Sequence, residues 1–178
     1  LGTGDAVNSA REFFKDRDST LLVLSGDVPM IRPETLAQLL QLHLGHRGKG
    51  AACTILTVKL SDPTGYGRII RDDGGRFEKI VEQRDATEKE RDIPEINAGI
   101  YCFDTRKLFE TLTHVQNHND QGEYYLTDVP ALIRAAGDDV AIYQHNDPHE
   151  IDGINNRAQL ADRAGGHPGL RRPGRDHR

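Results

Sequence analysis

Apolar residues fall into short unbroken runs that alternate with helical repeats along the chain. Residues 21–24 are four consecutive aliphatic residues, a pattern typical of a strand buried on both faces of a parallel sheet. The other runs predict further strands: residues 51–58, 95–103 and 140–143. A hairpin is also expected, with strands at residues 68–70 and 77–82 around a turn at residues 72–75.

Helices are predicted between these strands. Pro33 suits a first helical turn, and Leu36, Leu39, Leu40 and Leu44 follow on one expected face, with His43 and His46 solvated and the helix ending near Gly45. Further helices are expected after Asp104 and after Gly122. Strands that alternate with helices predict an α/β layered domain with a mostly parallel sheet and an antiparallel hairpin inserted in it.

Composition narrows the class of protein. The chain has 178 residues, enough for one sizeable domain, and its formal charge of -5 argues against a dominant surface for nucleic acid or an anionic membrane. No stretch approaches the roughly 20 apolar residues of a membrane span. Cys53 and Cys102 lie in apolar runs without metal-ligand spacing, so we expect reduced core residues of a cytoplasmic protein.

The two ends of the chain differ from the rest. The sequence begins without methionine and already within a loop, so we expect its true start to be missing. Residues 163–178 are rich in arginine, glycine and proline, cannot form a core, and are expected to be a disordered or non-native tail after a domain at residues 1–162. A basic tail could instead bind nucleic acid or a membrane, but low complexity without aromatic residues favours the first interpretation.

The strongest candidate for chemistry ends the first apolar run, in the sequence Ser25-Gly26-Asp27. Ligands sit beyond the carboxyl ends of strands in parallel α/β sheets, and glycine lets a ligand approach the backbone. A carboxylate one residue later can hold Mg²⁺ against phosphate oxygens. An ordinary turn explains the same residue types equally well.

Other polar residues occupy positions of similar interest. Gly2 and Thr3 lie in a glycine-rich loop before a helix, where backbone N–H groups could face an anion or a nucleobase, although neither a dinucleotide fingerprint nor a P-loop is present. Gly67 would let a substrate lie against the backbone. Glu82 ends an apolar run. Its carboxylate could accept a hydrogen bond from a sugar hydroxyl, or it could simply be the solvated end of a strand. Asn97 interrupts an apolar strand and must find hydrogen bonds from the protein or from a ligand.

Two pairs of adjacent residues late in the chain leave alternatives open. Tyr124 and Tyr125 either pack in the core or place their hydroxyl groups at the edge of a polar pocket. Of Asn155 and Asn156, one suits a helix cap, and the other is a candidate magnesium ligand through its carboxamide oxygen.

Seven short motifs occur in order along residues 1–161: LGTGDA, SGDVPM, DPTGYGRI, IVEQRDAT, EINAGIYCFD, QGEYYLTDV and GINNRAQL. Together they resemble the N-terminal uridyltransferase domain of the bacterial family of bifunctional N-acetylglucosamine-1-phosphate uridyltransferases. The resemblance implies a Rossmann-like, GT-A-like domain of three layers. It also implies that UTP and N-acetylglucosamine 1-phosphate react to give pyrophosphate and UDP-N-acetylglucosamine, a precursor of peptidoglycan and lipopolysaccharide.

The resemblance also implies roles for individual residues. Gly2 and Thr3 match the loop that holds the uracil. The segment that lies beneath the nucleotide is matched by Ser25, Gly26 and Asp27. Asp27 and Asn155 match the two protein ligands of a catalytic Mg²⁺. The residues that match the sugar pocket are Gly67, Glu82, Asn97, Tyr125 and Thr127.

This sequence departs from the family pattern in several places. Asp5 stands where histidine is usual and Ser25 where tyrosine is usual, and both could retune the nucleotide site. The family's first strand and glycine-rich phosphate loop should precede Leu1, and its C-terminal β-helix, which forms a homotrimer, is not present in this sequence. We therefore expect this chain alone to be nearly inactive. The alternatives are a catalytically inactive fragment that only binds a nucleotide-sugar, or a related sugar-1-phosphate nucleotidyltransferase.

Overall fold

One long strand organises the sheet in the computed structural model, which describes residues 1–14, 17–28 and 30–151. This strand, β5 (Glu95–Asp104), is buried along almost its whole length. Within the described ranges the sheet has six strands, in the order β4-β3-β5-β2-β6, with β1 also paired to β5. The other strands are β1 (Thr20–Leu24), β2 (Cys53–Lys59), β3 (Arg68–Arg71), β4 (Phe77–Val81) and β6 (Val140–His145).

The strand directions correct one prediction. Strand β5 runs antiparallel to β1, β2 and β3, and β3 runs antiparallel to β4, which confirms the predicted hairpin. The one parallel pair among the described strands is β2 with β6. The prediction of a mostly parallel sheet was therefore wrong, and the sheet is mixed and mostly antiparallel. An unbroken apolar run indicates that both faces of a strand are buried, but it does not indicate the direction of the neighbouring strands. An antiparallel strand between two layers of helices is also buried on both faces.

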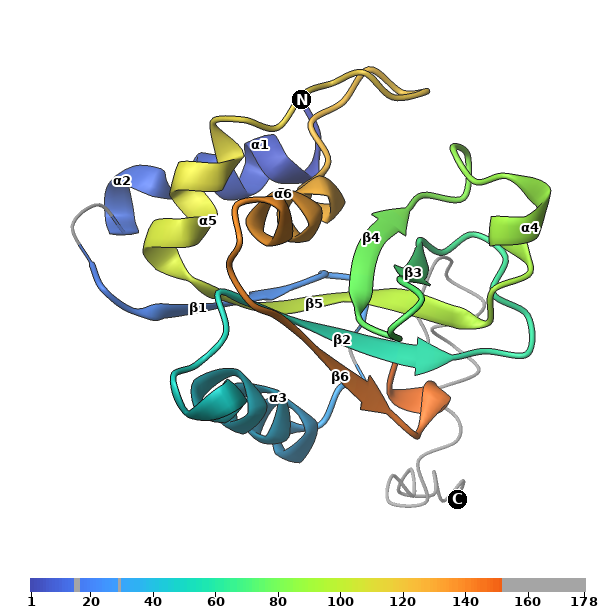
Figure 1. Ribbon diagram of the computed structural model, residues 1–178, viewed down its shortest axis with the longest axis horizontal. Helices are drawn as coiled ribbons and strands as arrows, with labels where there is room; N and C mark the ends of the chain where they lie inside the picture. The colour runs from blue at the N-terminus through green and yellow to red at the C-terminus, as the bar shows by residue number, and fades with distance from the viewer. Residues whose placement is uncertain (15–16, 29, 152–178) are drawn as a thin grey trace, which may run out of the picture.

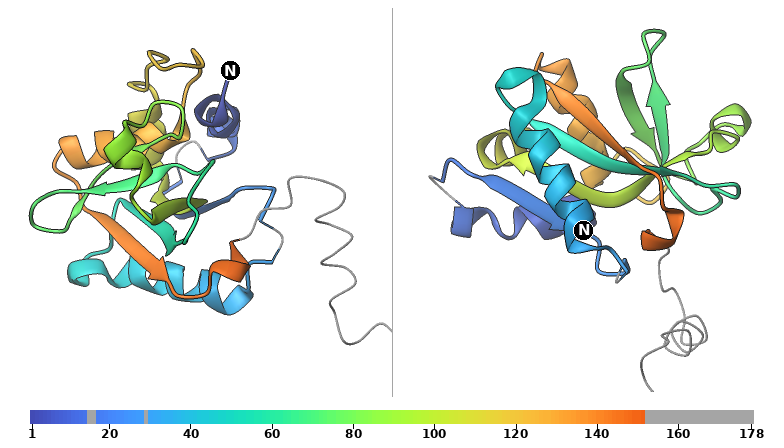
Figure 2. Two further views of the ribbon diagram at one scale, coloured as in Figure 1. Left: turned by 90° about the vertical axis from the view of Figure 1, so that its right-hand side faces the viewer. Right: turned by 90° about the horizontal axis from the view of Figure 1, so that it is seen from below.

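Helices cover both faces of the sheet (Figures 1 and 2). The α-helices are α1 (Thr3–Asn8), α2 (Arg11–Phe14), α3 (Pro33–Gly45), α4 (Glu88–Arg91), α5 (Thr105–Leu112) and α6 (Val129–Ala135). The described residues also form the short 3-10 turns η1 (His46–Gly48), η2 (Leu126–Asp128) and η3 (Pro148–Glu150). Helices α5 and α6 pack on one face and α3 on the other, so the chain forms an α/β domain with two apolar cores.

Side chains of β5 alternate between these two cores. Ile96, Ile100 and Cys102 belong to the core beneath α3, whereas Tyr101 and Phe103 belong to the core beneath α5 and α6. This is the two-residue period of a strand, hidden in the sequence because both faces are apolar. Cys53 and Cys102 are free and buried, as the sequence predicts. Within the described ranges, no helix has the length and apolar character needed to cross a membrane.

Strand β1 is more exposed than its apolar run predicts. Leu21 and Val23 pack against the core beneath α5 and α6, but Leu22 and Leu24, on the other face of the strand, are 37% and 42% exposed. Burial on both faces of this strand was therefore a wrong prediction.

Helix α3 has the predicted bounds but presents a different face to the sheet. Leu39 and His43 are buried, while Leu40 and Leu44 are exposed. The Nδ1 atom of His43 lies 3.0 Å from the Thr54 hydroxyl, and burial lowers the pKa of the imidazole. The expectation of a solvated His43 was wrong because its hydrogen-bond partner comes from β2, which the helical repeat alone does not reveal.

The arrangement along one edge of β5 creates the candidate site. Strand β1 pairs with β5 as far as Leu24 opposite Ile100, and β3 begins with Arg68 opposite Ile96. The carboxyl end of β1 therefore faces the amino end of β3 along a single edge. Between them, the loops that leave β1 and enter β3 open around the middle of β5.

Candidate functional site

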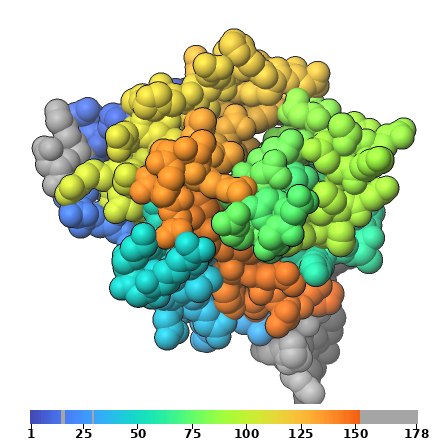
Figure 3. Space-filling view, in the orientation of Figure 1, coloured from blue at the N-terminus to red at the C-terminus, as the bar shows by residue number. Residues whose placement is uncertain are grey.

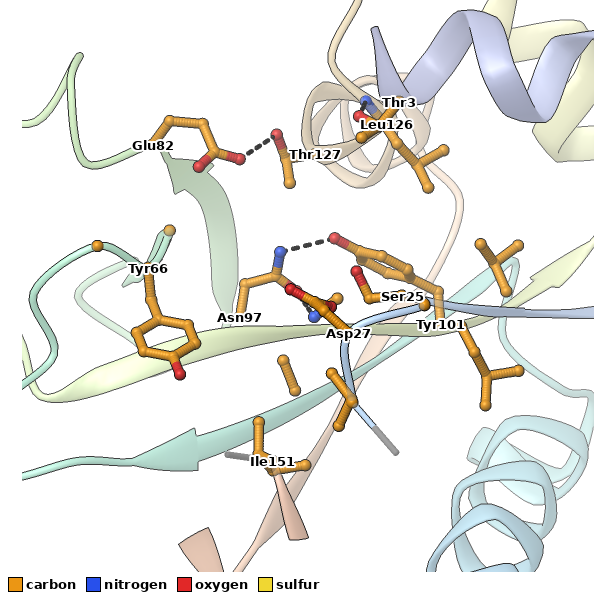
Figure 4. A pocket seen from close by; sticks show the side chains of 18 of the residues that line it. Thr3, Ser25, Asp27, Tyr66, Glu82, Asn97, Tyr101, Leu126, Thr127 and Ile151 are labelled. Atoms are coloured by element: carbon orange, nitrogen blue, oxygen red, sulfur yellow. Dashed lines mark hydrogen bonds between the residues drawn. The ribbon is translucent and has the colours of Figure 1, made fainter. Parts of the chain in front are cut away.

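A cavity of about 580 Å³ lies at this break between β1 and β3 (Figure 4). It is lined by α1, the end of β1 and the loop after it, the loop before β3, the middle of β5 and the turn η2, together with Glu82 after β4 and Ile151 after η3. Most of the predicted site residues meet here, namely Thr3, Ser25, Gly26, Asp27, Gly67, Glu82, Asn97 and Thr127. Loops far apart in sequence thus converge on the middle of one buried strand.

The loop after β1 supplies one wall. The Ser25 backbone N–H donates to the Gly99 carbonyl at 3.1 Å, which extends the pairing of β1 with β5 by one bond. Gly99 has φ of 71°, and a Cβ there would lie 3.0 Å from the Ser25 hydroxyl oxygen. Glycine at this position therefore lets the segment with Ser25 lie close against β5. Asp27 is exposed, and its carboxylate lines the cavity.

The opposite wall holds a partly buried carboxylate. The Thr127 hydroxyl donates to Glu82 Oε1 at 3.0 Å. Burial raises the pKa of Glu82, an effect that the Thr127 bond opposes and the nearby Asp85 carboxylate reinforces. Gly67 lies against the same side chain, because a Cβ there would be 3.4 Å from Glu82 Oε2 and 3.0 Å from Ile80 Cγ2. A larger residue at position 67 would therefore crowd Ile80 and come into contact with Glu82.

Asn97 finds its partners inside the protein. Its side-chain Nδ2 donates to the Tyr101 hydroxyl at 2.7 Å, and its Oδ1 accepts from the Gly99 backbone N–H at 3.1 Å. Its backbone N–H donates to the Gly67 carbonyl at 2.9 Å and joins β5 to the loop before β3. These bonds fix the amide at the base of the cavity, where Figure 4 shows it beside Tyr101.

The N-terminal loop docks onto the segment before α6. Thr3 accepts a hydrogen bond from the Leu126 backbone N–H at 3.0 Å, and the Gly4 N–H donates to the Tyr124 carbonyl at 2.8 Å. Gly2 has φ of 138°, and a Cβ there would lie 2.6 Å from that same carbonyl oxygen. Gly2 therefore permits the close approach that places Thr3 on the cavity wall.

Comparison with known proteins assigns the family. Residues 1–147 match the family model described as nucleotidyl transferase. The chain belongs to this nucleotidyl transferase family. It is similar to the bifunctional protein GlmU of Brevibacillus brevis, with 49% identity over 162 residues that cover 91% of this chain and 34% of the relative.

Other relatives carry the same printed name. The bifunctional protein GlmU of Geobacillus sp. (strain WCH70) is 48% identical over 91% of this chain and 35% of the relative. The one from Enterococcus faecalis is 48% identical over 90% of this chain and 34% of the relative. The chain thus spans about a third of the length of these relatives and is homologous to their N-terminal region.

Two of the predicted site residues that the structure describes, Gly2 and Tyr125, lie outside the cavity wall. Gly2 lies beside it and acts on Thr3 through the backbone. Tyr125 lines a neighbouring cavity of about 800 Å³, which opens between β4 and the segment near residue 120 (Figure 3), and its hydroxyl accepts from Gln121 at 2.7 Å. Asn155 falls outside the described residues. Asp5, one of the family departures, is exposed and is not among the residues that line the cavity.

Several wall residues were not predicted from the sequence. Tyr66, Tyr101, Val28 and Ile151 all line the cavity. Tyr101 could have been found, because it lies four residues after Asn97 in the same strand and therefore on the same face. Burial raises the pKa of its phenol, so it is a neutral group that accepts from Asn97.

The charge of the wall bears on metal binding. In the described part of the chain, the charged side chains on the wall are Asp27 and Glu82, and no lysine or arginine lines it. The described part of the chain as a whole also contains no cluster of three or more histidine, cysteine or acidic side chains suited to a metal ion. Asp27 is an exposed carboxylate without an ion-pair partner in the described part of the chain, so it fits the hard oxygen ligands that Mg²⁺ prefers.

Proposed function

We propose that the cavity binds a nucleotide and a sugar phosphate. In this proposal a uridylyl group passes from UTP to N-acetylglucosamine 1-phosphate, which gives UDP-N-acetylglucosamine and pyrophosphate. One observation carries the proposal: a single cavity is lined by Thr3 and residues 25–27, matched to the nucleotide, and by Gly67, Glu82, Asn97 and Thr127, matched to the sugar. Membership of the nucleotidyl transferase family and similarity to proteins named GlmU support the same reaction class. The finer assignment to a Rossmann-like, GT-A-like fold belongs to this proposal.

The two walls of the cavity would bind different substrates. Thr3 and the segment from Ser25 to Asp27 would hold the nucleotide, while Gly67, Glu82, Asn97 and Thr127 would hold the sugar. The phosphate oxygen of the sugar would then attack the α-phosphorus of UTP in line with the departing pyrophosphate. No covalent enzyme intermediate is needed, so the contribution of the chain is positioning and electrostatics.

Glu82 suits the recognition of a sugar hydroxyl. Its Oε1 accepts from Thr127, and its other oxygen lies beside Gly67 on the cavity wall. A carboxylate is an acceptor with several lone pairs, so Glu82 can accept a further hydrogen bond while it keeps that of Thr127. Asn97 is held by Tyr101 and Gly99, which fixes its amide before a ligand arrives.

Asp27 and, in the proposal, Asn155 would hold Mg²⁺. The metal would offset the negative charge of the phosphate groups. The position of Asp27 on the cavity wall, three residues after the end of β1, supports this role.

Binding without turnover is the second candidate, and the charge of the cavity favours it. Without a basic side chain on the described wall, the phosphates would enter a cavity whose charged side chains are both carboxylates. Loss of a preorganised donor to a transition state costs about 3–4 kcal/mol in known cases. A chain with this wall could bind a nucleotide-sugar product, which has two phosphates, and still turn over UTP slowly.

Calorimetry on the 178-residue chain with Mg²⁺ tests the proposal. We expect UDP-N-acetylglucosamine to bind about tenfold or more tightly than ADP-glucose or GDP-mannose. Pyrophosphate release from UTP and N-acetylglucosamine 1-phosphate then separates turnover from binding alone. Preference for an adenine or guanine nucleotide-sugar would assign a different transferase, and absence of binding to all three would refute the proposal.

A further inference from the structure

The first residue of β3 is a buried arginine without an ion-pair partner in the described part of the chain. Arg68 is 1% exposed, and no described carboxylate lies within 4.0 Å of its guanidinium. Burial lowers the pKa of Arg68, the positive charge of Arg91 adds to that effect, and Asp62 opposes it. A buried charge is costly unless hydrogen bonds replace its hydration, so the partners of this group need an explanation.

The partners of Arg68 are neutral oxygens from three different segments. Its Nη1 donates to the Tyr66 carbonyl. Its Nη2 donates to Gln83 Oε1 at 2.7 Å, and both Nε and Nη2 donate to the Arg91 carbonyl at 3.3 Å. The guanidinium therefore connects the loop before β3, the segment after β4, and the end of α4.

Two of these segments form part of the cavity wall. Residues 64–67 line the cavity, and so does Glu82, the neighbour of Gln83. The Gln83 amide oxygen also accepts from the Gly65 backbone N–H at 3.1 Å, so this one oxygen joins the loop and Arg68. Arg68 itself does not line the cavity.

The position of this loop determines the geometry of the wall. The Gly67 carbonyl accepts from the Asn97 backbone N–H, and a Cβ added to Gly67 would lie 3.4 Å from Glu82 Oε2. A shift of the loop would therefore alter the spacing between Gly67, Glu82 and Asn97 together. Arginine suits this role because its planar fork offers five donors in fixed directions, whereas lysine offers a single flexible ammonium.

We propose that Arg68 is a positioning residue for the sugar-binding wall: it holds residues 64–67 against Gln83 and so sets the spacing of Gly67 and Glu82. The part of this inference that concerns the sugar rests on the proposed function. Arg68 acts through the loop and touches no ligand.

The first test replaces Arg68→Met in the full chain and measures affinity by calorimetry. We expect binding of UDP-N-acetylglucosamine to weaken about tenfold or more, with the affinity for UDP unchanged within about twofold. The matched control is Arg71→Met, which removes a second guanidinium from β3 that pairs with Glu95 at 2.7 Å away from the cavity. Both variants should lower the melting temperature, but only Arg68→Met should change the ratio of the two affinities.

A second pair of variants keeps the inference testable if Arg68→Met does not fold. Gln83→Glu preserves an oxygen that accepts from both Arg68 and Gly65, so it should bind the nucleotide-sugar as the unaltered chain does. Gln83→Leu removes that oxygen and should weaken the same binding. Equal affinities for the two Gln83 variants would overturn the inference.

Hydrogen exchange distinguishes this inference from the proposed function. The Gly65 amide should exchange about tenfold faster in Arg68→Met or Gln83→Leu than in the unaltered chain, and at an unchanged rate in Arg71→Met. This measurement needs no ligand. If the unaltered chain binds no nucleotide-sugar, the proposed function fails, while an unchanged Gly65 exchange rate refutes the anchoring role of Arg68.

Discussion

Glu82 shows how a single side chain balances stability against recognition. Its partial burial disfavours the charged form, and the Thr127 hydroxyl recovers only part of the lost hydration. A protein that needed only stability would place a neutral residue here. The carboxylate is therefore consistent with a binding role, since buried ionisable groups with shifted pKa values gather at functional sites.

The pH dependence of unfolding tests this view of Glu82. Its pKa is raised in the folded state, so folding favours the protonated form, and stability falls as pH rises from its ordinary value of 4.5 through the raised value. Glu82→Gln should remove this loss. In urea titrations between pH 4 and 7, the unaltered chain should lose stability relative to Glu82→Gln. The difference in the free energy of unfolding should therefore grow with pH in favour of the variant, as proton linkage to the raised pKa of Glu82 requires.

The Glu82→Gln variant should also bind UDP-N-acetylglucosamine more weakly, because an amide accepts fewer hydrogen bonds than a carboxylate. Glu78→Gln is the control, since Glu78 is exposed in β4, the strand that ends just before Glu82. A stability difference that does not vary with pH would contradict the account of Glu82.

At the scale of elements, the loop after β1 is tied to the end of the described chain. Glu150, in η3, has a side chain only 4% exposed. It accepts from the Thr35 hydroxyl at 2.6 Å and from the Arg32 backbone N–H at 3.2 Å, and its Oε1 lies 3.3 Å from His145 Nε2. This cluster joins the start of α3 to the segment after β6, on the side of the sheet where Ile151 and Val28 share a core.

Removal of the Glu150 carboxylate should therefore loosen two segments together. Burial alone would raise the pKa of Glu150, but the bonds from Thr35 and Arg32 and the charges of His145 and Arg32 hold it below its usual value. Its stabilising effect is thus present above pH 4.5 and lost as pH falls through the lowered pKa. Glu150→Gln should cost about 1.5–3 kcal/mol of unfolding free energy at pH 7 and less at pH 3.

Asp147→Asn serves as the control for Glu150. Asp147 pairs with the largely exposed Arg32 at 3.4 Å, so its loss should cost less than about 1 kcal/mol. If the two variants lose the same free energy of unfolding in urea, the buried hydrogen bonds of Glu150 stabilise the fold no more than an exposed ion pair does.

The positions of these elements were more predictable than their directions. Apolar runs located β2, β5 and the β3–β4 hairpin, and Pro33 with Gly45 bounded α3. A run such as that of β5 does not encode which neighbour it pairs with, so a parallel sheet was predicted where most pairs are antiparallel. His43 was misplaced for the same reason, because its partner Thr54 comes from another element.

Predictions for the site depended on residue chemistry more than on local structure. Polar residues at strand ends, such as Ser25 and Glu82, and the polar Asn97 within an apolar strand, all meet in one cavity. Tyr101 and Ile151 escaped prediction because aromatic and aliphatic residues in a strand or turn are ordinary core residues until a cavity is seen beside them. Polar residues of a site can therefore be recognised from the sequence, whereas its apolar residues are recognised only once the cavity is known.

For the whole molecule, charge sets the conditions for phosphate binding. The chain carries a formal charge of -5, and the charged groups on the described cavity wall are both carboxylates. A triphosphate would approach this wall against electrostatic repulsion. Proteins that bind nucleic acid with basic surfaces lose affinity as salt rises, and the opposite dependence is expected here when no divalent cation is present.

Titration of UTP at several salt concentrations tests this expectation. Without Mg²⁺, affinity should increase between about 0.02 and 0.3 M salt, because the Debye length falls from roughly 20 Å to 6 Å and repulsion is screened. With Mg²⁺, binding should be tighter and less sensitive to salt, and Asp27→Asn should abolish that gain while the affinity for uncharged uridine stays the same. Affinity for UTP that falls as salt rises without Mg²⁺ would place an attractive positive charge at the phosphates, from residues outside those that line the described wall.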